Sequence, residues 1–210
     1  IDDFVEREQA RGLTSVSIKR TIAEPLACFR WANKRYRLKW RNIDLPPLPA
    51  HKPKQKKPLP HDDQRRLVDL CMSSNDWVSA AMLVMLQGGC MPSERARLRP
   101  AVDLNLEADI PHLVISGGDD GITKQESRKR IVPIVIGLGV VIENIVEAIE
   151  RLAATKDPSA TISKRLRTHI SPDYSSHCLR HSFRLNGISA NINPQFLQAI
   201  GGWSGGNINK

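Results

Sequence analysis

The sequence predicts a mainly helical protein with one small antiparallel β-sheet, an α+β fold. Apolar residues recur at helical spacing through most of the 210 residues, and segments typical of strands occur only between 101 and 136. A basic, proline-rich stretch at 46–60 separates a short helical part from a longer mixed part. We therefore expect a helical domain at 1–45, a linker at 46–60 and a second domain at 61–210.

The first domain is expected to contain two or three helices. One covers 1–11. A second covers 17–36, and Thr14 and Ser15 before it are typical of a helix start. Pro25 falls inside the second pattern and predicts a kink or a break there. The apolar and aromatic side chains of this domain are expected to form its core: Phe4, Leu13, Ile18, Ile22, Leu26, Phe29 and Trp31.

The linker combines six prolines with five lysine or histidine side chains. Proline neither continues a helix nor pairs within a central strand, so this stretch is expected to be semi-extended. Its lysines are expected either to lie near a polyanion or to form a solvated tether: Lys52, Lys54, Lys56 and Lys57.

The second domain begins with a helix at 61–72, whose N-terminus carries Asp62 and Asp63. The segment 77–87 is too continuously apolar for a surface helix, so we expect it to be the central buried helix, ending at Gly88-Gly89. Strands are expected at 113–116 and 130–136 around a turn at 117–121, followed by helices at 140–154 and 162–169.

Composition narrows the class of partner. Thirty-one lysines and arginines against 22 aspartates and glutamates give a formal net charge of +9 and favour a polyanionic partner.

The four cysteines, Cys28, Cys71, Cys90 and Cys178, follow no zinc or disulfide spacing and are expected to be reduced, buried thiols of a cytoplasmic protein. No apolar run reaches the roughly 18 residues of a membrane span. Because the chain begins at Ile1 without Met, we expect it to be a fragment.

The most specific motif lies near the C-terminus. His177 and Arg180 are three residues apart, so on a helix they share one face and can hold one anion. Gly201-Gly202-Trp203 follows and places an indole N–H donor after a tight bend. This spread of donors suits a phosphodiester.

The motif resembles the tyrosine recombinase (phage integrase) family, in which H-x-x-R on a helix is followed at this spacing by G-[HW]. The order of segments is similar too: a small helical core-binding domain, a basic linker and a catalytic domain with a three-stranded sheet. The resemblance implies a clamp around double-stranded DNA, a homo-tetramer on two duplexes, and accessory DNA-bending or excision proteins. It also implies a bacterial or phage-encoded, nucleoid-associated protein of a mobile element, with no membrane partner.

In this family a tyrosine attacks the scissile phosphate, forming a 3′-phosphotyrosyl bond without metal, cofactor or ATP. The family holds the scissile phosphate with two arginines, called clamp arginines here. By position, Arg180 matches the second clamp arginine, His177 the donor or proton-handling histidine and Trp203 the third donor. Ser175 or Ser176 is expected to cap the helix that carries them. Lys124, with Lys129 as competitor, matches the lysine that protonates the leaving 5′ oxygen.

Further DNA contacts are expected from basic side chains outside this motif. The candidates are Lys19, Arg20 and Arg128, together with the four linker lysines.

The sequence departs from the family at two places. The family pattern T-G-x-R-x-x-E matches Gly89 and Glu94, but Met91 stands at the first clamp arginine. Aligning Arg95, Arg97 or Arg99 there instead would break the match at Gly89 and Glu94. The family spacing puts the nucleophilic tyrosine near position 212, past Lys210, so we expect its segment to be missing and nominate neither Tyr36 nor Tyr174.

Two functions follow from the resemblance: a site-specific recombinase impaired at residue 91, or a catalytically inactive, sequence-specific DNA-binding relative with a regulatory or architectural role. A third hypothesis treats the motif matches as accidental, in a basic helical protein that binds RNA or another protein. The agreement of four separate segments in order and spacing argues against it.

Overall fold

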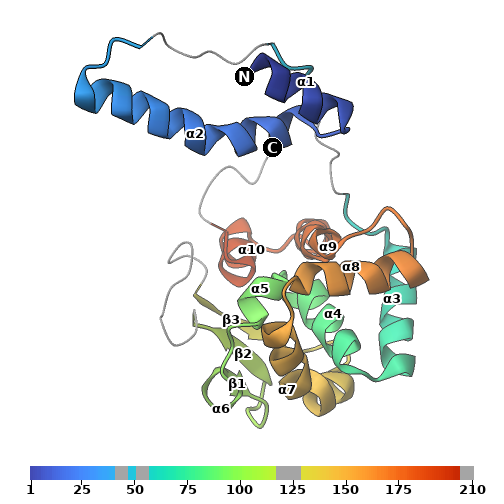
Figure 1. Ribbon diagram of the computed structural model, residues 1–210. Coiled ribbons are helices and arrows are strands. Elements are labelled where there is room, and N and C mark those ends of the chain that lie inside the picture. The colour runs from blue at the N-terminus through green and yellow to red at the C-terminus, as the bar shows by residue number, and fades with distance from the viewer. Residues whose placement is uncertain (41–46, 51–56, 117–128, 204–210) are drawn as a thin grey trace. The chain divides into compact units, whose positions relative to one another are not determined.

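The computed structural model describes residues 1–40, 47–50, 57–116 and 129–203. The chain divides into two compact units, Ile1–Gln55 and Lys56–Lys210, and each is described by itself (Figure 1).

The first unit contains two helices with a narrow apolar contact. Helix α1 (Asp2–Ala10) precedes α2 (Ser15–Tyr36), whose N-cap Thr14 accepts a hydrogen bond from the Ser17 N–H at 3.3 Å. The side chains buried in this part are few: Val5, Ile18, Ile22 and Leu26, together with Glu8, which pairs with Arg7 and Arg11. Such a small core leaves most of both helices in contact with solvent.

Helix α2 runs through Pro25 as one helix, so, of the predicted kink or break, the break is wrong. Proline lacks the N–H that would bond to the carbonyl of residue 21. Both Pro25 and Thr21 are exposed, so this carbonyl reaches water and the helix continues. The prediction that Trp31 belongs to the core is wrong as well, because its side chain is 59% exposed. It stands five residues after Leu26, which carries it off the buried stripe of the helix.

The second unit is built around α4 (Trp77–Gly88), and the sequence prediction of a central buried helix here is confirmed. Its N-cap Asp76 accepts the Ser79 N–H at 2.8 Å, and it ends at Gly89 in the left-handed conformation, φ +61°. Helices α3 (His61–Ser74), α7 (Leu138–Ala154) and α9 (Ser176–Ser189) pack around α4.

Helix α8 (Pro158–His169) also packs on α4 and begins four residues before its predicted start. The reason is a local cap: the Asp157 carboxylate accepts the Ala160 N–H at 3.0 Å, and Pro158 occupies the first helical position.

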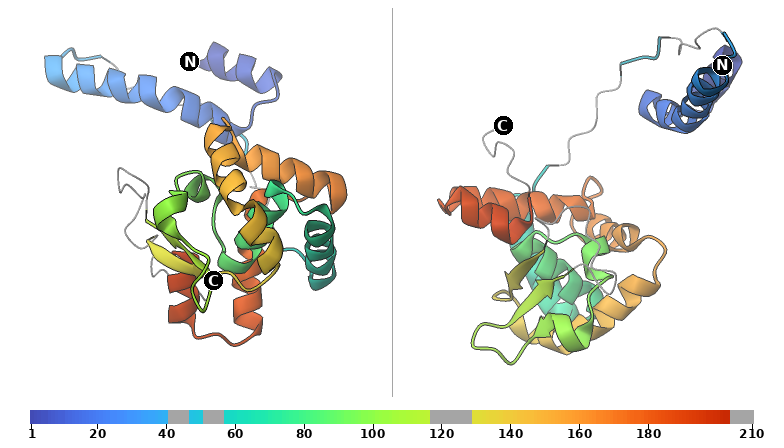
Figure 2. Two further views of the ribbon diagram at one scale, coloured as in Figure 1. Left: turned by 90° about the horizontal axis from the view of Figure 1, so that it is seen from below. Right: turned by 90° about the vertical axis from the view of Figure 1, so that its left-hand side faces the viewer.

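A three-stranded antiparallel sheet lies on one side of α4, with α3 on the other side (Figures 1 and 2). Its order is β1 (Leu104–Asn105), β2 (His112–Ile115) and β3 (Arg130–Pro133). Leu113 of β2 pairs with Val132 of β3, and both are fully buried. The predicted α+β class, mainly helical with a small antiparallel sheet, is therefore confirmed.

Strand β3 ends at Pro133, three residues before the predicted end. The reason is that the chain leaves the sheet to bond elsewhere: the N–H groups of Val135 and Ile136 donate to the Gln87 side-chain oxygen at 2.6 and 2.8 Å.

Three short helices complete the described part of this unit: α5 (Pro92–Arg95), α6 (Pro100–Asp103) and α10 (Pro194–Gly201). Helix α10 packs against α9 and β3.

The cysteines are partly as predicted. Cys71, Cys90 and Cys178 are buried free thiols, and burial, the largest influence, raises the pKa of Cys71 to about 12. Cys28 is exposed, so the prediction of burial is wrong for that residue, which faces away from the thin apolar stripe of α2. Among the described residues, no helix is long and apolar enough to cross a bilayer.

Candidate functional site

The first turn of α9 carries the predicted histidine and arginine. Ser175 is its N-cap residue, as the sequence predicts, and the Ser176 N–H donates to the Ser163 hydroxyl at 3.0 Å, which anchors the buried start of the helix. His177 is exposed, and Arg180 is half-buried one turn further along. Their spacing puts both side chains on the same face of α9.

Arg180 bridges the end of α4 and the end of the described chain. Its Nη1 donates to the Gly89 carbonyl, and its guanidinium carbon lies 4.7 Å from the centre of the Trp203 ring. An arginine over an indole face is held by a cation–π attraction. The structure thus brings together Arg180 and Trp203, which are 23 residues apart in the chain.

Two glycines explain how Trp203 comes to lie there. After α10, Gly202 adopts a left-handed conformation, φ +62°, and the Trp203 N–H donates to the Gln198 carbonyl at 3.1 Å. The indole folds back over Gly201, where a Cβ atom would lie only 2.1 Å from the ring. The ring also stacks on Phe183 at 5.9 Å. The Gly-Gly-Trp sequence is therefore needed for this tight reversal.

The segment between Gly89 and Glu94 lies beside Arg180. Met91, half-buried, is the N-cap of α5, and its backbone N–H donates to Glu94 Oε2 at 2.8 Å. The Glu94 side chain is 9% exposed. A carboxylate buried to this degree requires a cationic partner.

That partner is Arg130, which the sequence analysis did not single out. Its Nη2 donates to Glu94 Oε2 at 3.0 Å and its Nε donates to the Ile200 carbonyl at 2.8 Å. The Arg130 side chain is only 3% exposed. Strand alternation was a usable signal, because Arg130 shares the inward face of the segment with Val132 and Ile134.

The charges of this cluster stabilise one another. Burial by itself would raise the pKa of Glu94, but the hydrogen bond and charge of Arg130, the Met91 N–H and the charge of Arg180 together lower it. Burial likewise opposes the charge of Arg130, whose pKa is nevertheless raised by Cys90 and Glu94. Both groups are therefore ionised, and Arg130 neutralises the carboxylate beside Arg180.

Comparison with solved structures identifies this architecture. No protein-family model and no curated relative matches the chain. The Tn1549 transposon integrase in complex with transposon right end DNA is similar over 94% of this chain and 74% of that one, with a TM-score of 0.60 and 17% identity. The same integrase with a circular intermediate DNA gives the same values. The XerA recombinase matches 96% of this chain and 87% of its own, with a TM-score of 0.53 and 18% identity.

The chain has the tyrosine recombinase fold. The other residues that the resemblance singled out fall into two groups in this fold. Lys19, Arg20, Lys57 and Lys129 are exposed. Lys52, Lys54, Lys56, Lys124 and Arg128 lie outside the described residues.

Lys129 lines a shallow depression of about 590 Å³ between β3 and α10. Its lining comes from these two elements, the residue before β3 and Trp203: Lys129, Arg130, Ile131, Gln195, Gln198, Ala199, Ile200 and Trp203. The depression opens beside the Trp203 indole that covers Arg180. The Lys129 side chain therefore borders the cluster of Arg180 and Trp203.

Of the three arginines that follow Met91, Arg99 is paired with a carboxylate. Arg99 Nε donates to Asp103 Oδ2 at 3.2 Å, which ties it to α6. Arg97 follows α5 in the sequence and is exposed. The side chain of Arg95 lies outside the described part of the structure. None of these contacts supplies a guanidinium in place of the Met91 side chain.

The two tyrosines of the chain are engaged elsewhere in the recombinase fold. Tyr36 ends α2 and is exposed. The Tyr174 hydroxyl donates to Asp63 at 2.5 Å, and burial followed by this hydrogen bond raises its pKa to about 12. A phenol that resists ionisation in this way is a poor nucleophile.

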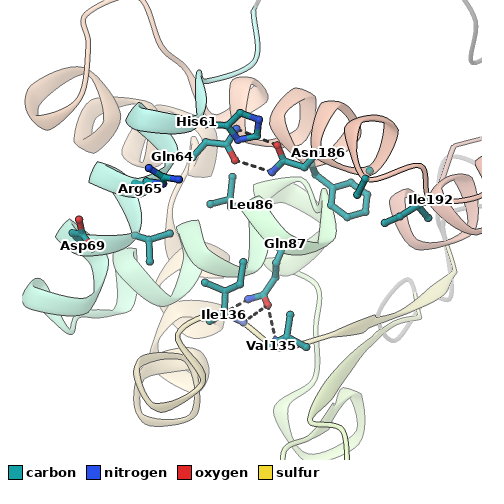
Figure 3. Close-up of a pocket in the computed structure, with 14 residues that line it drawn as sticks. His61, Gln64, Arg65, Asp69, Leu86, Gln87, Val135, Ile136, Asn186 and Ile192 are labelled. Carbon is teal, nitrogen blue, oxygen red and sulfur yellow. Dashed lines mark hydrogen bonds between the residues drawn. The ribbon is translucent and has the colours of Figure 1, made fainter.

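A separate apolar cavity of about 480 Å³ lies between α3, the end of α4 and α9 (Figure 3). Its amide groups bond to protein partners: Gln64 and Asn186 to each other, and Gln87 to the backbone of Val135 and Ile136. The exposed lining of this cavity is mostly apolar, and the convergence of donors from separate segments is found instead at the Arg180 and Trp203 cluster, which is the candidate site.

Proposed function

We propose that this protein is a site-specific DNA recombinase of the tyrosine type, which cleaves and rejoins duplex DNA through a 3′-phosphotyrosyl intermediate. The observation that carries the proposal is the Arg180 guanidinium, set between the Gly89 carbonyl and the Trp203 ring on the helix face that also carries His177. Segments from three parts of the chain converge there, as a phosphate clamp requires.

The chemistry assigns a role to each side chain. The phosphorane-like transition state carries negative charge on its non-bridging oxygens, which the planar fork of Arg180 can neutralise. Trp203 contributes an indole N–H that donates but cannot shuttle a proton, and His177 handles the proton of the nucleophile. Lys124 or Lys129 protonates the leaving 5′ oxygen. The nucleophile is a tyrosine expected near position 212.

DNA engagement would use the exposed cations of both units. Lys19 and Arg20 are exposed on α2, and Lys57 is exposed in the linker. Together with Lys52, Lys54, Lys56 and Arg128, they would neutralise backbone phosphates and close the clamp around the duplex. We further propose a homo-tetramer on two duplexes, accessory DNA-bending or excision proteins, and a cytoplasmic, nucleoid-associated protein that integrates or excises a mobile element.

Met91 favours a second candidate function. A thioether offers neither charge nor fork, and loss of one preorganised donor typically costs about a hundred- to a thousandfold in rate. Arg130 neutralises Glu94, and its guanidinium is held by that carboxylate and the Ile200 carbonyl. The alternative is therefore a catalytically inactive, sequence-specific DNA-binding relative with a regulatory or architectural role.

A suicide-substrate assay with the full-length gene product tests both candidates. The substrate is a nicked duplex of the target that traps the covalent protein–DNA adduct. We expect Met91→Arg to raise adduct formation about a hundredfold or more over the natural protein. Met91→Gln, similar in length but uncharged, is the matched control and should remain at the natural level.

The outcomes separate the two functions. Adduct in Met91→Arg that disappears when Arg180→Gln is added supports the recombinase. DNA binding by every variant without adduct supports the non-cutting relative. Absence of duplex DNA binding by the natural protein overturns both.

A further inference from the structure

Arg130 is an unusual residue for the inward face of a small sheet. A buried guanidinium is costly unless all its donors are used in good geometry. Here the side chain is 3% exposed, and it reaches two segments far from β3 in sequence, through Glu94 after α4 and Ile200 near the end of α10. Arg130 therefore connects β3, to which it belongs, with α5 and α10.

Gly202 lies close to this guanidinium, with no room for a side chain between them. A Cβ atom at Gly202 would lie 2.6 Å from Arg130 Nη1 and 2.9 Å from its Cζ. Because Gly202 is also the left-handed residue that ends α10, the position of the chain reversal depends on the guanidinium beneath it. The reversal in turn sets the direction in which Trp203 leaves the helix.

Trp203 is the next residue, and its ring is what covers Arg180. The neighbours of the ring in this position include Phe183 at 5.9 Å and the Arg180 guanidinium at 4.7 Å. A shift of the α10 end by a fraction of the cation–π distance would weaken this contact, because the attraction requires the cation within about 6 Å of the ring.

We propose that Arg130 is a positioning residue of the phosphate site. By bridging the Glu94 carboxylate and the Ile200 carbonyl beneath Gly202, it holds Trp203 over Arg180, and it neutralises the Glu94 carboxylate beside that arginine. The placement of Trp203 stands on the structure alone, and its consequence for DNA rests on the function proposed above.

The placement is tested on the free protein labelled with 5-fluorotryptophan. The four tryptophans give four ¹⁹F resonances, and Trp203→Phe assigns one of them. Arg130→Lys keeps the charge and the stem but cannot serve both acceptors as a fork does, so we expect the Trp203 resonance to shift and broaden while the other three stay. Arg130→Met should shift it further.

Two matched controls accompany these variants. Arg151→Met also removes one arginine over an indole, because Arg151 lies 5.7 Å from the Trp77 ring, and it should move only the Trp77 resonance. Gly202→Ala pushes directly on Arg130 and should reproduce the Trp203 shift, whereas Gly139→Ala, where a Cβ meets nothing within 4 Å, should leave it in place.

Should Arg130→Met unfold the second unit and move the Trp77 resonance together with that of Trp203, Arg130→Lys decides the matter. An unmoved Trp203 resonance in Arg130→Lys overturns the proposal, and so does an equal shift of all four.

The consequence for DNA is tested by a double-mutant cycle on duplex affinity. If Arg130 acts through the indole, Arg130→Lys and Trp203→Ala each weaken binding by about three- to tenfold, and the double variant is no weaker than Trp203→Ala alone. Fully additive losses overturn the positioning role. A shifted Trp203 resonance with unchanged DNA affinity in both single variants supports the placement and instead contradicts the phosphate site.

Discussion

Charged residues and buried apolar side chains are distributed very unequally between the two units of the chain. Residues 1–55 hold 12 lysines and arginines against six aspartates and glutamates, while residues 56–210 hold 19 against 16. The core shows the opposite distribution: the first unit buries four large apolar side chains among its described residues, whereas in the second unit nearly the whole of α4 is buried. Most of the net charge therefore sits on the part of the protein with the least apolar burial.

On the function proposed above, this difference lets one protein meet two physical demands. Attraction to a polyanion acts over about a Debye length and tolerates mobile side chains, so a thin helical unit can supply it. A phosphate clamp requires donors held within a fraction of an ångström, so it needs a rigid core behind it. Arg180 and Arg130 both lie in the unit with the larger core.

The largest effect is expected in the core of the second unit. Leu83→Ala removes a fully buried side chain from α4 and should lower the free energy of unfolding by about 2–5 kcal/mol. Urea denaturation followed by circular dichroism measures it. Leu138→Ala, at a site 37% exposed, is the matched control and should cost far less. Equal costs at the two sites would contradict the contrast between core and surface.

A gain of stability is expected in the first unit. Pro25→Ala restores the hydrogen bond to the Thr21 carbonyl inside α2 and should stabilise that unit by about 1–3 kcal/mol. Thermal unfolding monitored through Trp31 and Trp40, both in this unit, measures it. Pro158→Ala, at the first position of α8 where proline is favourable, should give no gain. If Pro25→Ala destabilised α2, an unseen contact of the proline ring would be responsible.

The division of charge predicts which unit governs salt dependence. On the function proposed above, replacing Lys19 and Arg20 together by Ala should weaken duplex DNA binding about tenfold and reduce the salt slope of log Kd by about two. Fluorescence anisotropy at several salt concentrations measures both quantities. Replacing Arg7 and Arg11 removes the same charge from the same unit, but these arginines already pair with Glu8, so a smaller loss is expected. Equal losses would show that net charge matters and position does not.

The smallest effect concerns the helix caps. Asp76 caps α4 and bonds Arg165 at 2.6 Å. Burial alone would raise its pKa, but the Ser79 N–H and Arg165 together lower it. The folded pKa therefore lies below the unfolded value of about 3.9, so the stabilisation by the charge is complete above that pH and is lost as the pH falls through the folded pKa.

Asp76→Asn should accordingly cost about 1 kcal/mol at pH 7, with the cost shrinking on acidification. Urea denaturation between pH 7 and pH 3 measures it. Thr14→Ala at the exposed cap of α2 should show a similar or smaller cost with no pH dependence. A pH-independent cost for Asp76→Asn would contradict the assigned role of the carboxylate.

Local patterns were enough to locate most elements. Thr14 before α2, the apolar run of α4 and the glycine at 89 are signals contained in a few adjacent residues, and the elements they predict are present. The H-x-x-R spacing likewise placed His177 and Arg180 on one helix. Where local signals failed, the exposure of neighbouring groups explains it: Pro25 is tolerated because the Thr21 carbonyl reaches water, and Trp31 lies off the buried stripe.

The sequence by itself determined the fold class, the helix that carries the candidate clamp and the absence of an arginine at residue 91. These depend on periodicity and spacing, which are properties of short stretches. Only the tertiary structure decided that Arg130 pairs with Glu94, that Gly202 lies on that guanidinium and that Trp203 comes to rest over Arg180. Residues 23 or more positions apart meet there, and the burial that makes an arginine a partner of a carboxylate exists only once the core around α4 has formed.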